Sequence, residues 1–304
     1  MTELRSYYGR PVLKEPVWTW EIPAYFFTGG IGGASAGLGL AARIAGNERL
    51  ARTSMYVGAA ADAVSPLLLV SDLGRPERFL KMLRVFKVTS PMSVGSWLLF
   101  VSAGASVTAA ALEKLGRLKR LELAAEVVSA VTGAPLATYT GGLVADTAVP
   151  AWHDARRELP YVFGASGVAG AGAACTLFLD PEEAAPARRL AVAGAAAELG
   201  LVHAMERRLG PLVSEPYRQG TAGKLMRASK VCVSAGAGLL GSRGRHSRRA
   251  AVAGGALVLT GEALLRFAVW KAGAQSARDP RYTVVPQRER VTDRSQVSAR
   301  TSRE

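Results

Sequence analysis

Long apolar segments separated by short polar connections recur along the whole chain. The first runs from Ile22 to Ala42, which is 21 residues without a charge. About 20 apolar residues in a helix cross the ~30 Å hydrocarbon core of a bilayer. Seven further segments have the same character, at residues 55–70, 94–112, 124–148, 160–179, 190–209, 227–240 and 250–272. Because lipid offers no hydrogen-bond partner to a non-helical backbone, the pattern predicts an all-α integral membrane protein with eight transmembrane helices.

The order of these segments divides the chain into four parts. We expect a polar N-terminal segment, transmembrane helices 1–4, transmembrane helices 5–8 and a polar C-terminal tail, at residues 1–21, 22–148, 149–272 and 273–304. The two halves open alike, since Pro16-Val17-Trp18 precedes the first span and Pro150-Ala151-Trp152 precedes the fifth. Internal repeats are common in membrane folds, so we expect two related four-helix bundles. Chance similarity between Gly- and Ala-rich helices is the alternative.

The charge balance is strongly basic, with 38 Lys and Arg against 24 Asp and Glu and a net charge of +14. The basic residues are spread over every connection, which favours topology determinants that contact lipid headgroups over a nucleic-acid surface. The sequence therefore predicts a multi-pass protein of the cell membrane, with membrane lipid and no nucleic acid among its partners. A signal peptide in place of the first span is the alternative, although 21 residues exceed the usual h-region of about 7–15.

Cysteine and histidine are too scarce for most redox centres. The chain has two Cys and three His, whereas an iron–sulfur cluster needs about four thiolates. Cys175 and Cys232 lie inside apolar segments and suit helix packing. We therefore expect no metal, haem or iron–sulfur cluster in this chain.

Three glycines of the first span are spaced four residues apart. Gly29, Gly33 and Gly37 thus share one helix face, and small residues at this spacing let another backbone approach closely in lipid. No strand pattern precedes them, so a dinucleotide-binding loop is excluded.

Two polar motifs flank the connection between the second and third spans. SDLGRPERF at 71–79 follows the second span, and SPMSVGSW at 90–97 opens the third. Together with Tyr139-Thr140-Gly141 and an ending from Gly261 to Pro280, they resemble the NrfD/PsrC family. These are the quinone-binding membrane subunits of polysulfide reductase-type molybdoenzyme complexes.

The resemblance implies a subunit that binds a quinone, with menaquinone favoured, and has no turnover alone. Its partners would be a four-cluster ferredoxin-like iron–sulfur subunit and a molybdopterin catalytic subunit. Such a complex would be formate dehydrogenase- or polysulfide reductase-like and would exchange electrons with the quinone pool. A proton-translocating subunit and a purely structural anchor are the alternatives.

The resemblance also implies a quinone site. Tyr139 matches the tyrosine of the fourth helix that holds the quinone in the polysulfide reductase branch. Tyr25 stands where that branch has a histidine, and Ile22 stands where it has an asparagine. Tyrosine can donate a hydrogen bond and isoleucine cannot, so Tyr25 is the second candidate ligand. The adjacent Glu21 is a candidate proton donor.

Asp72, Arg75 and Arg78 lie in the basic connection 71–93. The family match favours a role in docking the iron–sulfur subunit, and a solvated charged loop is the alternative. Gly74 and Pro76 flank Arg75, which indicates a fixed turn.

Five ionisable residues well inside the spans are candidates for a role within the membrane. A charge at mid-bilayer costs about 2.5–3.5 kcal/mol, so such residues usually face the bundle interior. Asp62, Glu198 and His203 are candidates for a proton path, with Asp62 preferred. Glu262 and Arg266 are spaced i, i+4, which predicts a structural ion pair.

Overall fold

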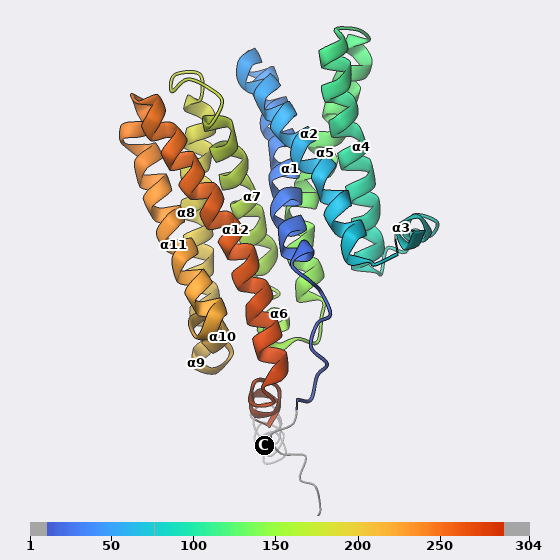
Figure 1. The fold of residues 1–304 in the computed structure, drawn as a ribbon, viewed down its shortest axis with the longest axis vertical. Helices are drawn as coiled ribbons and strands as arrows, with labels where there is room; N and C mark the ends of the chain where they lie inside the picture. The colour runs from blue at the N-terminus through green and yellow to red at the C-terminus, as the bar shows by residue number, and fades with distance from the viewer. Residues whose placement is uncertain (1–10, 76, 289–304) are drawn as a thin grey trace, which may run out of the picture.

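A computed structural model describes residues 11–75 and 77–288, and all regular secondary structure in these ranges is helical (Figure 1). The long helices are α1 (Glu21–Ile44), α2 (Glu48–Asp72), α4 (Pro91–Leu115), α5 (Lys119–Ala145), α7 (Leu159–Thr176), α8 (Ala185–Arg208), α11 (Gly220–Gly241) and α12 (Arg248–Arg278). The short ones are α3 (Glu77–Met82), α6 (Pro150–Asp154), α9 (Gly210–Val213), α10 (Glu215–Arg218) and a 3-10 helix at Arg243–Arg245. Each predicted span coincides with one long helix, and the all-α class is confirmed.

Four helices, α2, α4, α5 and α12, are long and apolar enough to cross a membrane by their own length and composition. The other long helices are either too highly charged or not apolar enough to meet this criterion. α8 and α11 carry more charged residues, whereas α1 and α7 are rich in Gly and Ala. Thirteen of the 18 residues of α7 are buried against other helices, so its neighbours rather than lipid surround it. The count of eight spans stays a prediction.

The long helices run roughly parallel to one another in two groups that share an interface (Figure 1). α1, α2, α4 and α5 pack together, α7, α8, α11 and α12 pack together, and α1 and α5 contact α7 between the groups. The turns after α1, α4, α7 and α11 lie at what we call the upper end, and α6, α9 and α10 lie at the lower end.

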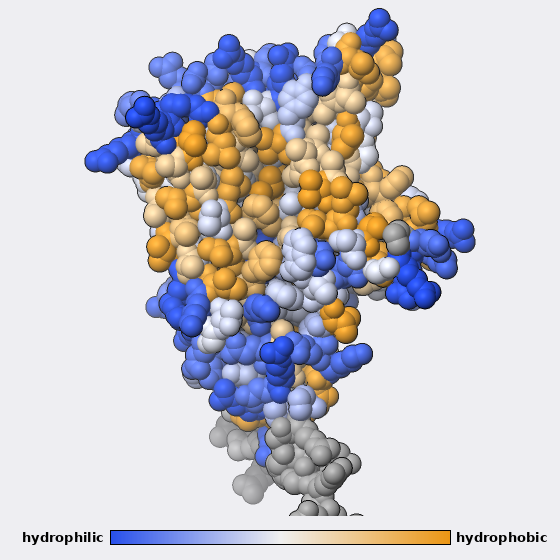
Figure 2. All heavy atoms as spheres, viewed as in Figure 1, coloured by the Kyte–Doolittle hydropathy of each residue, from blue (hydrophilic) through white to orange (hydrophobic). Residues whose placement is uncertain are grey.

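Figure 2 shows apolar side chains across the middle of the visible face, with hydrophilic side chains above and below them. This distribution is typical of a membrane protein. The internal repeat stays a prediction.

Glycine brings the backbone of α1 against three neighbours. A Cβ on Gly133 of α5 would lie 2.6 Å from the Gly33 carbonyl oxygen, and a Cβ on Gly167 of α7 would lie 2.7 Å from that of Gly30. Gly32 faces the carboxyl group of Asp62 in α2. The predicted close approach of another helix is thus present at Gly33. It is absent at Gly37, which is exposed and where an added Cβ would have no described atom within 4 Å.

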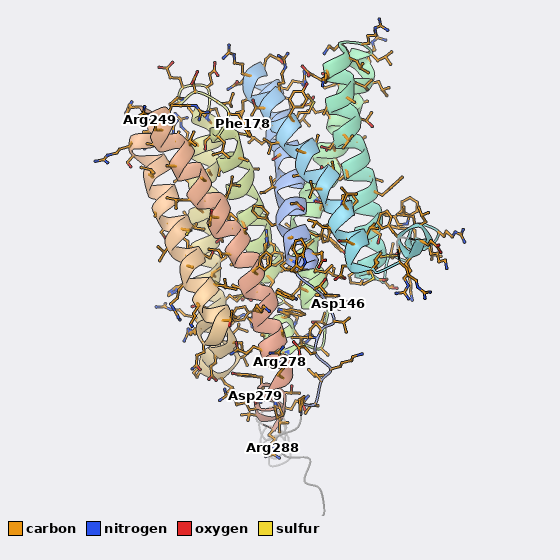
Figure 3. All side chains as sticks on the ribbon, viewed as in Figure 1. Asp146, Phe178, Arg249, Arg278, Asp279 and Arg288 are labelled. Carbon is orange, nitrogen blue, oxygen red and sulfur yellow. The ribbon has the colours of Figure 1, made fainter. Side chains whose placement is uncertain are left out.

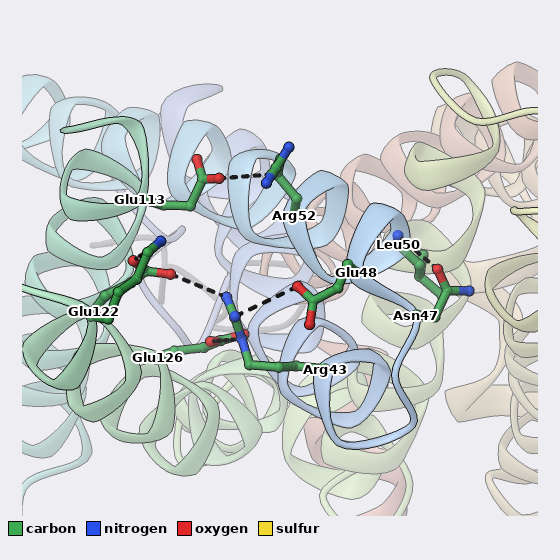
Figure 4. Close-up of polar contacts among 9 residues, drawn as sticks. Arg43, Asn47, Glu48, Leu50, Arg52, Glu113, Glu122 and Glu126 are labelled. Atoms are coloured by element: carbon green, nitrogen blue, oxygen red, sulfur yellow. Dashed lines mark hydrogen bonds and ion pairs between the residues drawn. The ribbon is translucent and has the colours of Figure 1, made fainter. Parts of the chain in front are cut away.

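Arg43 holds the upper ends of α1, α2 and α5 together (Figure 4). Its guanidinium contacts Glu126 at 2.6 Å, Glu122 at 3.3 Å and Glu48 at 3.7 Å. Arg52 of α2 pairs similarly with Glu113 of α4 at 2.7 Å. Glu122 also pairs with Lys119 at 2.7 Å, so removal of Arg43 would leave the almost fully buried Glu126 without its cation.

Gly33→Leu should disrupt the fold, because its side chain would overlap the Gly133 backbone, and overpacking a tight site costs about 1–3 kcal/mol or more. We expect a much smaller monodisperse fraction after detergent extraction and a lower thermal midpoint. Gly37→Leu on the same helix is the matched control and should behave like the wild type. Equal behaviour of the two variants would contradict the role assigned to the α1 backbone contact.

Candidate functional site

A small cavity of about 90 Å³ lies toward the lower ends of α1, α2, α4 and α5. It is lined by Trp18, Ile22, Tyr25, Phe26, Leu69, Asp72, Leu73, Met82, Met92, Gly95, Ser96, Tyr139 and Leu143. The lining is mainly apolar, and it includes residues from both motifs at 71–79 and 90–97. Tyr25 and Tyr139, which are predicted for the quinone site, are therefore brought to one place, together with Asp72, which is predicted for partner docking.

Two phenol groups face this cavity from different helices. Tyr25 of α1 is only 2% exposed, and Tyr139 of α5 is partly buried. The Tyr139 ring occupies the space beside Gly95 of α4, where a Cβ would overlap it. Within the described part of the chain, neither hydroxyl has a hydrogen-bond partner. The cavity thus offers two free hydroxyl donors in apolar surroundings.

Asp72 closes the cavity from below by binding the N-terminal segment. Its Oδ1 accepts hydrogen bonds from the Thr19 backbone N–H at 3.0 Å and from the Thr19 hydroxyl at 2.6 Å. The same hydroxyl also contacts Glu21, the first residue of α1, which does not line the cavity. Since the Thr19 hydroxyl has one hydrogen, it donates to one carboxylate at a time. Asp72 is therefore engaged inside the subunit rather than displayed for a partner.

Residues 11–20, which we call the N-terminal strap, are fixed at two further points. Trp18 stacks on Trp152 of α6 with ring centroids 5.4 Å apart. Glu15 accepts two hydrogen bonds from Arg278 of α12, at 2.8 and 2.6 Å, and Arg278 lies at the lower end in Figure 3. The Arg278 guanidinium holds the pKa of the Glu15 carboxyl below its usual value. The strap thus connects both helix groups beneath the cavity.

Arg75 and Arg78 are exposed on the connection between α2 and α4. Gly74 before them has a φ of +64°, a conformation that favours glycine, so the turn predicted there is present. Pro76 lies outside the described residues. Neither arginine forms an ion pair within the described ranges. The same connection exposes Leu80, Val85, Phe86 and Val88.

Asp62 is fully buried near the middle of α2. It faces Gly32 of α1 and lies beside Ser106 of α4, but neither carboxyl oxygen has a partner within 3.5 Å among the described residues. One turn toward the lower end, the Ser65 and Thr28 hydroxyls are 2.7 Å apart. A Cβ on Gly29 would lie 3.8 Å from the Ser65 hydroxyl and 3.4 Å from the Tyr25 ring, so these side chains are close neighbours. Asp62, Ser65, Thr28 and Tyr25 thus follow one another toward the cavity, although the described residues contain no hydrogen bond from Ser65 to Asp62 or from Thr28 to the Tyr25 hydroxyl.

Glu198 lies in the other helix group, near Arg266, whose guanidinium lies beside Gly30 of α1. It is buried beside Glu262 of α12, and the Ser166 hydroxyl donates to Glu262 between them. His203 joins neither place, because its side chain is exposed on the outside of α8. The three residues predicted as one proton path therefore do not form a continuous one. The exposed position of His203 agrees with a residue near the membrane interface more than with a proton path.

The predicted ion pair between Glu262 and Arg266 is also absent as a direct contact among the described residues. Arg266 instead donates to the Phe163 carbonyl at 2.9 Å and stacks on the Phe163 ring at 3.8 Å from its centroid. Spacing of i, i+4 allows a pair, but the buried guanidinium finds these partners on α7.

Other features do not compete as the site. A larger cavity of about 620 Å³ lies between α6 and α9 and contains none of the residues predicted from the sequence. Within residues 11–75 and 77–288, no group of three or more His, Cys, Asp and Glu could hold a metal ion. Cys175 is buried against the Ser54 hydroxyl, as a packing residue would be.

The comparisons with known families identify the chain. The sequence model described as "Polysulphide reductase, NrfD" matches residues 11–205, well over half of the chain. The chain belongs to this family. The resemblance inferred from the motifs is thus confirmed, although the part from Gly261 to Pro280 lies outside the matched range. Subunits of the NrfD family are membrane proteins that partner with iron–sulfur and molybdopterin subunits. No match to a curated protein reaches significance.

The sequence did not identify the small residues whose role depends on which neighbouring helix they face. Gly95 makes room for Tyr139, and Ser65 and Thr28 lie between Asp62 and the cavity. Small residues at these positions resemble ordinary packing residues, so only the helix arrangement distinguishes them.

Proposed function

We propose that this chain is the quinone-binding subunit of a molybdopterin oxidoreductase, embedded in the cell membrane through all eight long helices. It would exchange electrons between the quinone pool and an iron–sulfur subunit, as in formate dehydrogenase- or polysulfide reductase-like complexes. The observation that carries this proposal is the pair of unpartnered hydroxyls, Tyr25 and Tyr139, in one apolar cavity bordered by the family's motif residues.

The lining suits a quinone headgroup. A bound quinone, with menaquinone favoured, would carry two electrons and two protons. Tyr25 and Tyr139 each donate a hydrogen bond toward one carbonyl oxygen, and the surrounding apolar side chains exclude water. The cavity of about 90 Å³ is smaller than the ~300 Å³ of typical ligand sites. Met82 and Met92, with their flexible side chains, are the residues that would move aside.

The partner position follows from the cavity position. An electron donor must approach the quinone, so the four-cluster ferredoxin-like subunit docks at the lower end, with the molybdopterin subunit beyond it. Arg75 and Arg78 are the family-motif cations available for this contact, with Lys81, Arg84 and Lys87 exposed on the same connection, and the exposed apolar side chains beside them extend the surface. Asp72 acts indirectly, by fixing the strap.

Proton supply is a second proposed role. Asp62, Ser65 and Thr28 form a polar row that ends at Tyr25, which supports delivery of protons to the cavity. Glu21 offers a shorter route from the lower surface through Thr19. Glu198 belongs to a separate buried cluster, so a path that includes it needs ordered water.

Tyr139→Phe should lower quinone-linked turnover. The substitution removes a donor to a buried acceptor and keeps the ring, which costs about 1–3 kcal/mol, or roughly 5–150-fold in affinity. Turnover of the assembled complex with an artificial dye should be unchanged. Tyr161→Phe, at an exposed tyrosine of α7, is the control. Quinone turnover equal to that of the wild type would identify the chain as a purely structural anchor.

Reversal of Arg75 and Arg78 to Glu should release the soluble subunits when membranes are washed. Like charges set against an acidic partner surface cost several kcal/mol. The variant should still insert normally. Arg117→Glu with Arg120→Glu, at the upper end, is the matched control and should retain the partners. Partners retained by both variants would show that the connection is only a solvated loop.

Asp62→Asn tests proton translocation. The variant keeps the side-chain shape but cannot carry a proton, so reconstituted complexes should lose proton pumping and retain electron transfer to quinone. Glu77→Gln, at an exposed position of α3, should leave both activities intact. If pumping persists in Asp62→Asn, the polar row has no part in it.

A further inference from the structure

A groove of about 370 Å³ lies between α8 and α11, at the upper end of the molecule. Its rim carries Arg188 and Arg189 from the start of α8 and Arg245 from the 3-10 helix after α11. Its floor consists of Val192, Ala193 and Ala196 of α8. It is therefore far from the quinone cavity, and it shares no residue with that cavity.

The three arginines have no acidic partner. Arg188 is only 8% exposed, and its Nη1 donates to the Pro181 carbonyl at 2.6 Å. Arg189 and Arg245 lie close enough to affect it electrostatically. No carboxylate in the described ranges lies within 4.0 Å of any of the three. Three cations held together without an anion are repulsive, which predicts that an anion normally binds between them.

The burial of Arg188 distinguishes the groove from the rest of the upper end. Among the described residues there, Arg43, Arg49 and Arg52 pair with carboxylates at 2.6, 2.6 and 2.7 Å, and Arg117 and Arg120 are unpaired but exposed to solvent. Arg188 is both buried and without a carboxylate, which a general excess of exposed basic side chains for topology does not account for.

The groove floor indicates what kind of anion binds. Below the arginines, Ala193 and Ala196 are exposed small residues, and Val192 is partly exposed beside them. The small side chains leave space along α8, which carries no charged residue from Leu190 to Ala197. A phosphate group would satisfy the arginines, but only a ligand with an attached hydrocarbon chain would also cover this floor.

We propose that the groove is a binding site for an anionic glycerophospholipid. Its phosphate lies among Arg188, Arg189 and Arg245, and one acyl chain follows Val192, Ala193 and Ala196 toward the middle of the bilayer. Basic pockets between membrane helices bind anionic headgroups in this manner. A free phosphate ion shares the headgroup chemistry but leaves the floor uncovered, so the two sources are separable.

The test uses the full chain, purified in detergent and offered phosphatidylglycerol or phosphatidylcholine, with bound lipid counted by native mass spectrometry. The wild type should retain one phosphatidylglycerol and little phosphatidylcholine. Arg188→Gln, Arg189→Gln and Arg245→Gln together should weaken retention on the order of 100-fold, since each arginine near a membrane surface contributes roughly fivefold. Lys114→Gln, Arg117→Gln and Arg120→Gln remove equal charge at the upper end and should retain the lipid.

Ala196→Phe keeps all three cations and fills the floor, so it should abolish lipid retention even if the triple variant does not fold. Inorganic phosphate should fail to displace the lipid from the wild type. Displacement by phosphate, or lipid binding by Ala196→Phe equal to that of the wild type, would identify a site for a free anion instead. Equal loss in both triple variants would show that only general surface charge attracts the lipid.

Discussion

The contact of the α1 backbone with α5 and α7 determines where the candidate site can form. Gly33 meets Gly133 without intervening side chains, and the two helices run in opposite directions. Tyr25 precedes Gly33 by eight residues, and Tyr139 follows Gly133 by six. At 1.5 Å per residue, both tyrosines therefore lie below the glycine contact, by roughly 12 and 9 Å along their helices. One glycine contact therefore brings two phenol groups to nearly the same depth in the membrane.

Buried ionisable groups occur in both helix groups, but in different settings. Asp62 is alone with hydroxyl groups, whereas Glu198 and Glu262 share the surroundings of Arg266. Each buried charge carries a cost in a bilayer that a packing role alone does not justify. Ser65 and Thr28 lie between Asp62 and the candidate cavity, so the first group is the better candidate for the proposed redox-linked proton movement.

The sequence alone predicted the helical segments, the family and the two tyrosines, because each depends on local pattern or on a contiguous motif. It failed where the outcome depends on which neighbour a helix meets. Gly37 shares its spacing with Gly33, yet no helix lies against it. Arg266 has Glu262 one turn away, yet its partners come from α7. His203 lies within an apolar segment, yet its side of α8 faces outward.

The burial of α7 constrains how the protein is made. This helix exposes little side-chain surface, so insertion into lipid alone stabilises it little, and its stability comes from the helices around it. α1 and α5 are synthesised before it, but α12, which also packs on it, is synthesised last. During translation α7 is therefore incompletely enclosed until the C-terminal helix arrives, and a chain that stops before α12 exposes its Gly- and Ala-rich surface to cellular quality control.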